Sequence, residues 1–238
     1  MIKVLLCGVH GKMGQVTAAA LTEAADLELV AGVGSQDDLA AALETHRPDV
    51  AIDFTTPAAV YANATTLIAH DVRPVIGATG MSPAEIDVLT QQCAARQLGG
   101  IIAPNFSLAA ILMMRAARDI AMYLPHCEII EMHHPFKKDA PSGTARKTAQ
   151  MMVQANAAVQ QSSDDFPARG DFTDGVPIHS VRLPGLFAHQ MVMFGNDGET
   201  LTLRYDGMDR GCCMPGVLLA CRQVMTLNKL IYGLEQLI

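Results

Sequence analysis

The first hundred residues of the chain alternate between short apolar runs and longer stretches with helical periodicity. We expect strands at Lys3–Cys7, Leu27–Val33, Val50–Phe54, Arg73–Ile76 and Gly100–Ala103. We expect helices between them, at about residues 13–24, 37–46, 57–70 and 83–97. Runs such as Val4-Leu5-Leu6 are apolar throughout, which is typical of strands covered by helices on both faces. The alternation predicts an α/β fold with a parallel sheet and right-handed crossovers.

The pattern changes after this region. A long helix is expected from about Ser107 to Tyr123, followed by a strand at Cys127–His133 and a helix from about Gly143 to Ala157. A Ser/Asp/Gly-rich stretch runs from Gln160 to Gly175. Three strand-like runs come after it, at Val176–Leu183, Phe187–Phe194 and Glu199–Tyr205. Their short connections, Pro184-Gly185 and Gly195 to Gly198, favour an antiparallel sheet.

Two domains follow from this change of pattern. A last helix near Pro215–Met225 is apolar enough to pack back on the first domain. We therefore predict a Rossmann-like dinucleotide-binding domain at residues 1–104, completed by residues 214–238. Residues 105–213 are predicted to form an α+β substrate-binding and oligomerisation domain with a mixed or antiparallel sheet.

The charge of the chain excludes several classes of function. Only 17% of the 238 residues are charged, and the net charge is -7. Nucleic-acid and membrane-surface proteins need a basic face, and no apolar run approaches the roughly 20 residues of a membrane span. The six cysteines include no C-x-x-C pair, and the N-terminal apolar run is too short for a signal peptide. We expect a cytoplasmic protein with reduced cysteines and no nucleic-acid or membrane partner.

A glycine-rich turn follows the first expected strand. It reads Gly8-Val9-His10-Gly11-Lys12-Met13-Gly14 and leads directly into a helix. Glycines at such a turn let the backbone approach a pyrophosphate, whose charge is stabilised by the helix N-terminus. His10 occupies the middle position of the strict G-x-G-x-x-G pattern, so the spacing is a looser relative of it. A dinucleotide site is predicted here, with a glycine-rich turn that binds no ligand as the alternative.

The choice between NADH and NADPH stays open at this point. An acid at the end of the second strand would hold the adenosine ribose, and a nearby arginine would favour a 2′-phosphate. The chain has Gly34-Ser35-Gln36 there. Asp37 and Asp38 come slightly later and are interpreted as caps of the next helix.

A basic cluster stands out in this acidic chain. Its members are His133, His134, Lys137, Lys138, Arg146 and Lys147, and Asp139 is the one acid among them. Ser142-Gly143-Thr144 opens the following helix, so backbone amides and two hydroxyls are available for a carboxylate or phosphate. Adjacent strand residues point to opposite faces, so His133 and His134 are poorly placed to share a metal ion, and we predict no metal site. The plain alternative is that these histidines and lysines are structural and solvated.

The same segment carries a family resemblance. From Glu131 to Ala145 it reads E-x-H-H-x-x-K-x-D-A-P-S-G-T-A, which resembles the signature of the dihydrodipicolinate (4-hydroxy-tetrahydrodipicolinate) reductases. The likeness extends over nearly the whole chain. It implies cofactor contacts at Gly8, Val9, His10, Gly11, Lys12, Met13, Gly34, Phe54, Gly77, Ala78, Thr79, Ala103, Pro104, Asn105 and Phe106. Two positions depart from the family: Gly34 stands where many members carry an acid, and Ala78 stands where threonine is common.

The resemblance implies an activity in lysine and diaminopimelate biosynthesis. The hydroxylated cyclic imine would lose water, take a hydride from NADH or NADPH, and be protonated to tetrahydrodipicolinate. His133 would be the general acid, and Lys137 a second proton donor or charge stabiliser. The substrate carboxylates would be held by His134, Lys137, Ser142, Gly143 and Thr144. The family is usually tetrameric, so a homotetramer is expected.

Two further expectations concern how the enzyme works. The lysines beside His133 should disfavour its cationic form, and a bound dianion should favour it, so the imidazole would become a competent acid mainly after substrate binds. The two-domain organisation also suggests closure on substrate, since hydride transfer needs the ring within about 3–3.5 Å of the nicotinamide.

Two rival functions remain in view. Another Rossmann oxidoreductase, acting on aspartate semialdehyde, homoserine or a sugar, would share the first domain but lack the DAPSGT segment. A nucleotide-sensing regulator would need a basic DNA-binding helix, and none is visible in the sequence.

Overall fold

The structure, a computed structural model, describes residues 1–159 and 169–238 and separates into two compact units. Unit 1 comprises Met1–Phe106 and Cys213–Ile238, and unit 2 comprises Ser107–Cys212. The polar stretch expected from Gln160 lies outside the described residues as far as residue 168. Assignment of unit 1 to the cofactor, and of unit 2 to substrate and oligomerisation, stays a prediction.

Unit 1 is built on a six-stranded parallel sheet. Its strands are β1 (Ile2–Cys7), β2 (Leu27–Val33), β3 (Val50–Asp53), β4 (Arg73–Ile76), β5 (Gly100–Ile102) and β11 (Leu230–Tyr232). Their order is β11-β5-β4-β3-β1-β2, and every neighbouring pair is parallel. The predicted α/β, Rossmann-like class is confirmed. The sequence analysis missed β11, because three residues are too few to show a period.

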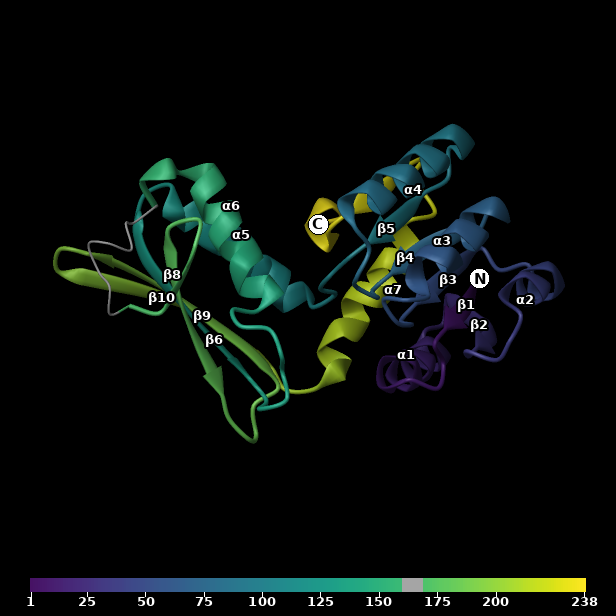
Figure 1. The fold of residues 1–238 in the computed structure, drawn as a ribbon, viewed down its shortest axis with the longest axis horizontal. Helices are drawn as coiled ribbons and strands as arrows, with labels where there is room; N and C mark the ends of the chain where they lie inside the picture. The colour runs from purple at the N-terminus through teal and green to yellow at the C-terminus, as the bar shows by residue number, and fades with distance from the viewer. Residues whose placement is uncertain (160–168) are drawn as a thin grey trace. The chain divides into compact units, whose positions relative to one another are not determined.

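Helices cover both faces of this sheet (Figure 1). They are α1 (Lys12–Glu23), α2 (Leu39–His46), α3 (Val60–Ala69), α4 (Pro83–Arg96) and α7 (Met214–Gln223). Helices α3 and α4 contribute Ile68 and Leu89 to one buried cluster with Ile76 of the sheet. Helices α1 and α7 contact each other on the opposite face. The sheet therefore lies between two layers, as expected for strands that are apolar on both faces.

Unit 2 contains a five-stranded mixed sheet. Its strands are β6 (His126–His133), β7 (Asp171–Thr173), β8 (Val176–Arg182), β9 (Ala188–Asn196) and β10 (Glu199–Gly207), in the order β10-β9-β6-β8-β7. Strand β6 is parallel to β8 and antiparallel to β9. The hairpin expected between β9 and β10 is confirmed. The expectation of antiparallel pairing across Pro184-Gly185 is wrong, because β6 lies between β8 and β9.

Two helices cover one face of the second sheet, as Figure 1 shows. They are α5 (Leu108–Ala121) and α6 (Gly143–Ala155), which contact each other. Each begins at a serine N-cap: Ser107 accepts a hydrogen bond from the Ala110 amide, and Ser142 accepts one from the Ala145 amide. Short 3-10 helices complete the described chain at Ala157–Val159, Arg210–Cys213 and Leu234–Gln236.

The alternation of side chains along β6 explains why this strand is central. Cys127, Ile129 and Glu131 are buried and share one face, whereas Glu128 and Ile130 are only partly buried and face the other way. Pairing on both edges satisfies the backbone of the strand, and His133 is its last residue. Among the described helices, none is long and apolar enough to cross a membrane.

Candidate active site

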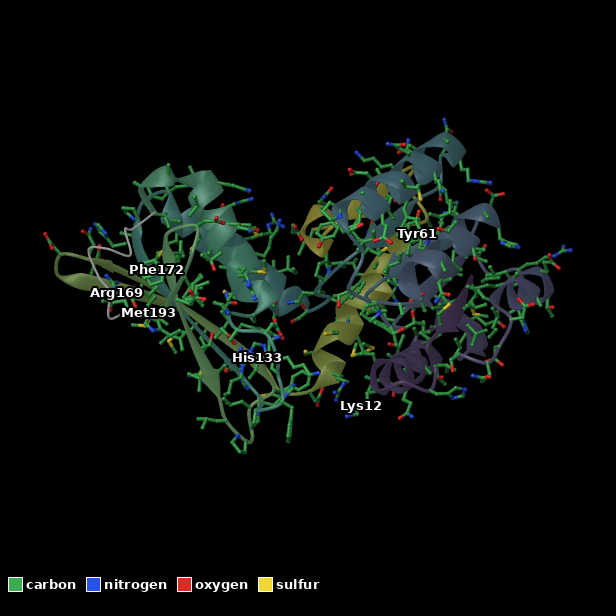
Figure 2. The ribbon with its side chains drawn as sticks, viewed as in Figure 1. Lys12, Tyr61, His133, Arg169, Phe172 and Met193 are labelled. Atoms are coloured by element: carbon green, nitrogen blue, oxygen red, sulfur yellow. The ribbon has the colours of Figure 1, made fainter. Side chains whose placement is uncertain are left out.

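The turn between β1 and α1 has no space for a side chain at two of its glycines. Gly8 has a φ of 82°, and its amide donates to the Val33 carbonyl at 2.8 Å. A Cβ on Gly14 would lie 2.2 Å from the Gly8 carbonyl oxygen and 2.8 Å from Val9 Cα. Only glycine fits either position, because the turn packs closely against the residues after β3 and the start of α1 packs closely against the turn. Lys12, labelled in Figure 2, is the first residue of α1 and is exposed.

The other expected cofactor contacts gather at the same edge of this sheet. The residues Phe54, Gly77, Ala78, Thr79, Ala103, Pro104, Asn105 and Phe106 all follow the carboxyl ends of β3, β4 and β5. The chain order reverses between β1 and β3, and in open α/β sheets ligands bind at this point. Phe54 and Phe106 pack edge to face, with ring centroids 5.9 Å apart. A Cβ on Gly77 would lie 2.2 Å from the Phe54 ring, so the aromatic pair requires glycine there.

The end of β2 differs from the sequence interpretation. Asp38 is the N-cap of α2, as expected, and accepts a hydrogen bond from the Ala41 amide at 3.2 Å. Asp37 is not a helix cap: its carboxylate accepts a hydrogen bond from the Gly34 amide at 2.7 Å. That oxygen lies 3.6 Å from the position that a Cβ on Gly34 would take. The strand end therefore has a carboxylate even though Gly34 itself supplies none.

His133, labelled in Figure 2, is the last residue of β6 and forms a short contact with a buried carboxylate. Its Nδ1 lies 2.6 Å from Oε2 of Glu131, and the Glu131 side chain is 0% exposed. The imidazole keeps 14% of its surface exposed. The pair thus joins a fully buried anion to a ring that retains access to solvent.

Glu131 is held by several donors. Both terminal nitrogens of the Arg182 guanidinium donate to it, at 2.9 Å and 2.7 Å, and the Ser142 amide donates at 3.2 Å. Burial alone would raise the pKa of Glu131. The hydrogen bonds from His133, Arg182 and Ser180, together with the Arg182 charge, outweigh burial and lower this pKa to about 2. The carboxylate is therefore ionised at neutral pH.

Lys137 and Ser142 already have partners within unit 2. The Lys137 ammonium donates to Asp139 at 2.8 Å. Partial burial would raise the pKa of Asp139, but the hydrogen bond from Lys137 and the Arg146 charge help to outweigh burial, so this pKa is lowered. The Ser142 hydroxyl caps α6, and its amide is bound to Glu131. Gly143 is exposed, and a Cβ there would meet no atom within 4 Å. Open access to the first turn of α6 is therefore greatest at Gly143.

His134 has an environment different from that of its neighbour. Its ring lies 6.3 Å from the Phe136 ring, centroid to centroid, at an angle of 39°. Its Nδ1 is buried and has no hydrogen-bond partner among the described residues. Within residues 1–159 and 169–238, no group of three or more His, Cys, Asp or Glu side chains is arranged to hold a metal ion.

Sequence reasoning did not identify two of the residues that form this site. Glu131 was read only as part of a motif, and Arg182 was not singled out at all. The two residues lie 51 positions apart, and their side chains meet only because β8 aligns beside β6. The one available signal was that Glu131 and His133 lie two and four residues after buried Ile129, since residues two apart on a strand share a face.

Comparisons with known proteins agree over the whole chain. Residues 2–106 match the family model described as dihydrodipicolinate reductase, N-terminus, and residues 109–238 match the C-terminal model of the same name. A 4-hydroxy-tetrahydrodipicolinate reductase of Coxiella burnetii (strain RSA 493 / Nine Mile phase I) is 54% identical over 237 residues, covering 100% of this chain and 99% of the relative. One of Legionella pneumophila (strain Lens) is 45% identical, covering 99% of each chain. A solved structure, dipicolinate-bound dihydrodipicolinate reductase from Paenisporosarcina sp. TG-14, superposes with a TM-score of 0.91 at 40% identity, covering 100% of both chains.

Proposed function

We propose a division of labour among the residues described above, on the premise that the chain belongs to the dihydrodipicolinate reductase family. The activity is the NADH- or NADPH-dependent reduction of 4-hydroxy-tetrahydrodipicolinate to tetrahydrodipicolinate, a step of lysine and diaminopimelate biosynthesis. The observation that carries the assignment of residues is the pairing of His133 with ionised Glu131, next to the N-terminus of α6.

Unit 1 is the part that fits the cofactor. A Cβ on Gly8 would lie 2.9 Å from the Phe54 carbonyl oxygen and one on Gly14 would lie 2.2 Å from the Gly8 carbonyl oxygen, which fits the tight turn and the close helix–strand packing of a dinucleotide-binding site. The residues Val9, His10, Lys12 and Met13 complete this turn, and the strand-end residues Gly34, Phe54, Gly77, Ala78, Thr79, Ala103, Pro104, Asn105 and Phe106 are proposed to contact the rest of the dinucleotide. When bound, the nicotinamide supplies the hydride.

Unit 2 is the part proposed to hold the substrate and the proton. Reduction of a conjugated imine leaves an electron-rich product that needs an acid, and His133 is our candidate for it. The protonated imidazole is compatible with its surroundings because Glu131 compensates its charge. Lys137 is proposed to stabilise negative charge on the substrate, exchanging its contact with Asp139 for a substrate carboxylate.

The substrate carboxylates are proposed to lie at the start of α6. Helix N-termini bind anions through their backbone amides, and Gly143 is the most open position of this one. Gly143, Thr144, His134 and Lys137 are the proposed contacts. Ser142 is proposed to act on the substrate indirectly, by capping the N-terminal turn of α6, because its own hydroxyl already accepts a hydrogen bond from the Ala145 amide.

We further propose a homotetramer located in the cytoplasm. Unit 2 exposes several large apolar side chains: Met193 lies on the face of the second sheet away from α5 and α6 (Figure 2), Leu201 lies on the other face, and Leu183 follows β8. Covering these side chains in an assembly would remove apolar surface from water. All six cysteines are free thiols, as expected in a reducing compartment.

The test is an assay of NADH and NADPH oxidation coupled to dihydrodipicolinate synthase. We expect turnover by the wild type and a fall in kcat of about 10²–10⁴ for His133→Ala, the usual contribution of a general acid. His126→Ala is the matched control, because His126 is an exposed histidine at the other end of β6. An inactive wild type would exclude the activity, and an unimpaired His133→Ala would exclude the role of His133.

A further inference from the structure

The environment of His133 includes a buried acid whose role the family signature alone does not explain. We propose that Glu131 is a positioning residue for His133: it binds the imidazole at Nδ1 and leaves Nε2 as the ring nitrogen that delivers the proton. This inference rests on the proposed function of His133 as the acid. Glu131 itself contacts no reacting atom, because its side chain is 0% exposed.

The hydrogen-bond geometry determines which nitrogen carries the fixed proton. An ionised carboxylate has only acceptor sites. The contact of 2.6 Å between Glu131 Oε2 and His133 Nδ1 therefore requires a hydrogen on Nδ1. Neutral His133 must then hold its lone pair on Nε2, for which the described residues offer no partner. A proton added to the ring goes to Nε2, on the side away from Glu131.

Arg182 explains why the proton stays on the imidazole and does not move to the carboxylate. Its two terminal nitrogens donate to both oxygens of Glu131, and it also donates to the Asp139 carbonyl at 2.8 Å. A carboxylate neutralised in this way is a weak base, so it orients the ring without taking its proton. Lys137 and Asp139 are paired with each other on this side, and the Arg146 charge also acts on Asp139. On β9 the residue opposite His133 is Ala188, which is uncharged.

The same carboxylate also connects the acid to the substrate cradle. Glu131 Oε1 accepts the Ser142 amide, which immediately precedes the first turn of α6. The imidazole and the helix N-terminus are therefore bound to the two oxygens of one buried group. One carboxylate therefore holds both the proposed proton donor and the residue that caps the proposed anion site.

The test compares wild type with Glu131→Gln by two measurements. Long-range ¹H–¹⁵N NMR of the full-length protein should show neutral His133 protonated at Nδ1 in the wild type, and this preference should be lost in Glu131→Gln. The alkaline limb of the pH profile of kcat/KM should move to lower pH by about 1 unit or more, because a positively charged ring loses its counter-ion. A reduction of kcat by about tenfold to a hundredfold should accompany the shift.

Glu128→Gln is the matched control. Glu128 lies on the same strand but on the opposite face, where it pairs with His179 at 2.6 Å. This control should leave both the tautomer and the alkaline limb of His133 unchanged. The inference is overturned by an Nε2-protonated ring in the wild type, by an unmoved limb in Glu131→Gln, or by an equal shift in Glu128→Gln.

The two measurements also separate this inference from the proposed function. The tautomer is read from the resting protein and needs no turnover, so the wild-type spectrum alone decides the pairing even if Glu131→Gln does not fold. Absence of activity on the coupled substrate together with an Nδ1-protonated ring would refute the proposed reaction and leave the pairing intact.

Discussion

The turn between β1 and α1 and the end of β6 are built by opposite means. At the turn, function depends on the absence of side chains, since a Cβ on Gly14 would come within 2.2 Å of the backbone. At the end of β6, function depends on side chains that meet from two strands: His133 and Glu131 on β6, and Arg182 on β8. The turn from Gly8 to Gly14, here called the backbone site, is encoded in a few consecutive residues. The cluster of His133, Glu131 and Arg182, here called the side-chain site, is encoded in how strands align.

The largest effect is expected from removing the cation of the side-chain site. Arg182→Met should lower the free energy of unfolding by about 3–5 kcal/mol, because it leaves the Glu131 carboxylate buried without its main counter-ion. Urea unfolding measures this. Arg204→Met is the control: Arg204 pairs with Asp206 at the surface, and its loss should change the free energy of unfolding by less than about 1 kcal/mol. Equal effects of the two substitutions would remove the contrast between buried and exposed pairs.

The second-largest effect is expected from acid, which should lower the free energy of unfolding through the same site. The pKa of Glu131 is lowered to about 2 from an ordinary value of 4.5. A lowered pKa in the folded state stabilises the protein above pH 4.5, and this stability is lost as the pH falls toward 2. The loss should be on the order of 3 kcal/mol, measured by urea unfolding at a series of pH values. Glu131→Gln should lose less over this range; an identical slope for both proteins would contradict the assignment.

The backbone site should respond to a single methyl group. Gly14→Ala should lower the free energy of unfolding by about 1–3 kcal/mol, because the turn must move to admit the Cβ. It should also weaken NADH binding by about a hundredfold, measured by calorimetry, since the displaced amides no longer meet the pyrophosphate. Gly195→Ala is the control, because a Cβ there meets nothing within 4 Å. Unchanged NADH affinity in Gly14→Ala would show that the turn is not the cofactor cradle.

The smallest effect is expected at the edge of the backbone site. Asp37 places a carboxylate at the end of β2, which favours ribose hydroxyls over a 2′-phosphate. We expect a preference for NADH over NADPH, and Asp37→Asn should reduce the ratio of the two kcat/KM values by up to about tenfold. Asp38→Asn removes the same charge one residue away and retains the helix cap, so it should change the ratio less. A wild type that prefers NADPH would contradict this prediction.

Sequence reasoning performed differently in the two regions for a physical reason. The strand–helix alternation and the glycine spacing from Gly8 to Gly14 are local signals, and they predicted the fold of unit 1 and its turn. The central position of β6 was not predictable, since pairing with β8 and β9 depends on competition among whole strands. Arg182 was missed for the same reason, because nothing local marks a residue that acts 51 positions away.

Short elements and local hydrogen bonds account for the remaining differences. Strands β7 and β11 have three residues each, so neither shows an alternation of apolar residues. Asp37 was taken for a helix cap because aspartate commonly caps helices, but its carboxylate bonds backward to Gly34. The charges around His133 also differ from the expectation. The sequence showed only the neighbouring lysines, whereas the structure adds the ionised carboxylate of Glu131 in direct contact with the imidazole.

The bond between Glu131 and the Ser142 amide has a consequence for the energetics of binding. Because β6 is paired on both edges and both carboxylate oxygens are occupied, the imidazole and the start of α6 lose their freedom of rotation when the chain folds. The conformational entropy of aligning the imidazole with the start of α6 is therefore lost when the protein folds, and it is not lost again each time a substrate binds. The imidazole and the start of α6 are therefore already in fixed positions when a substrate binds.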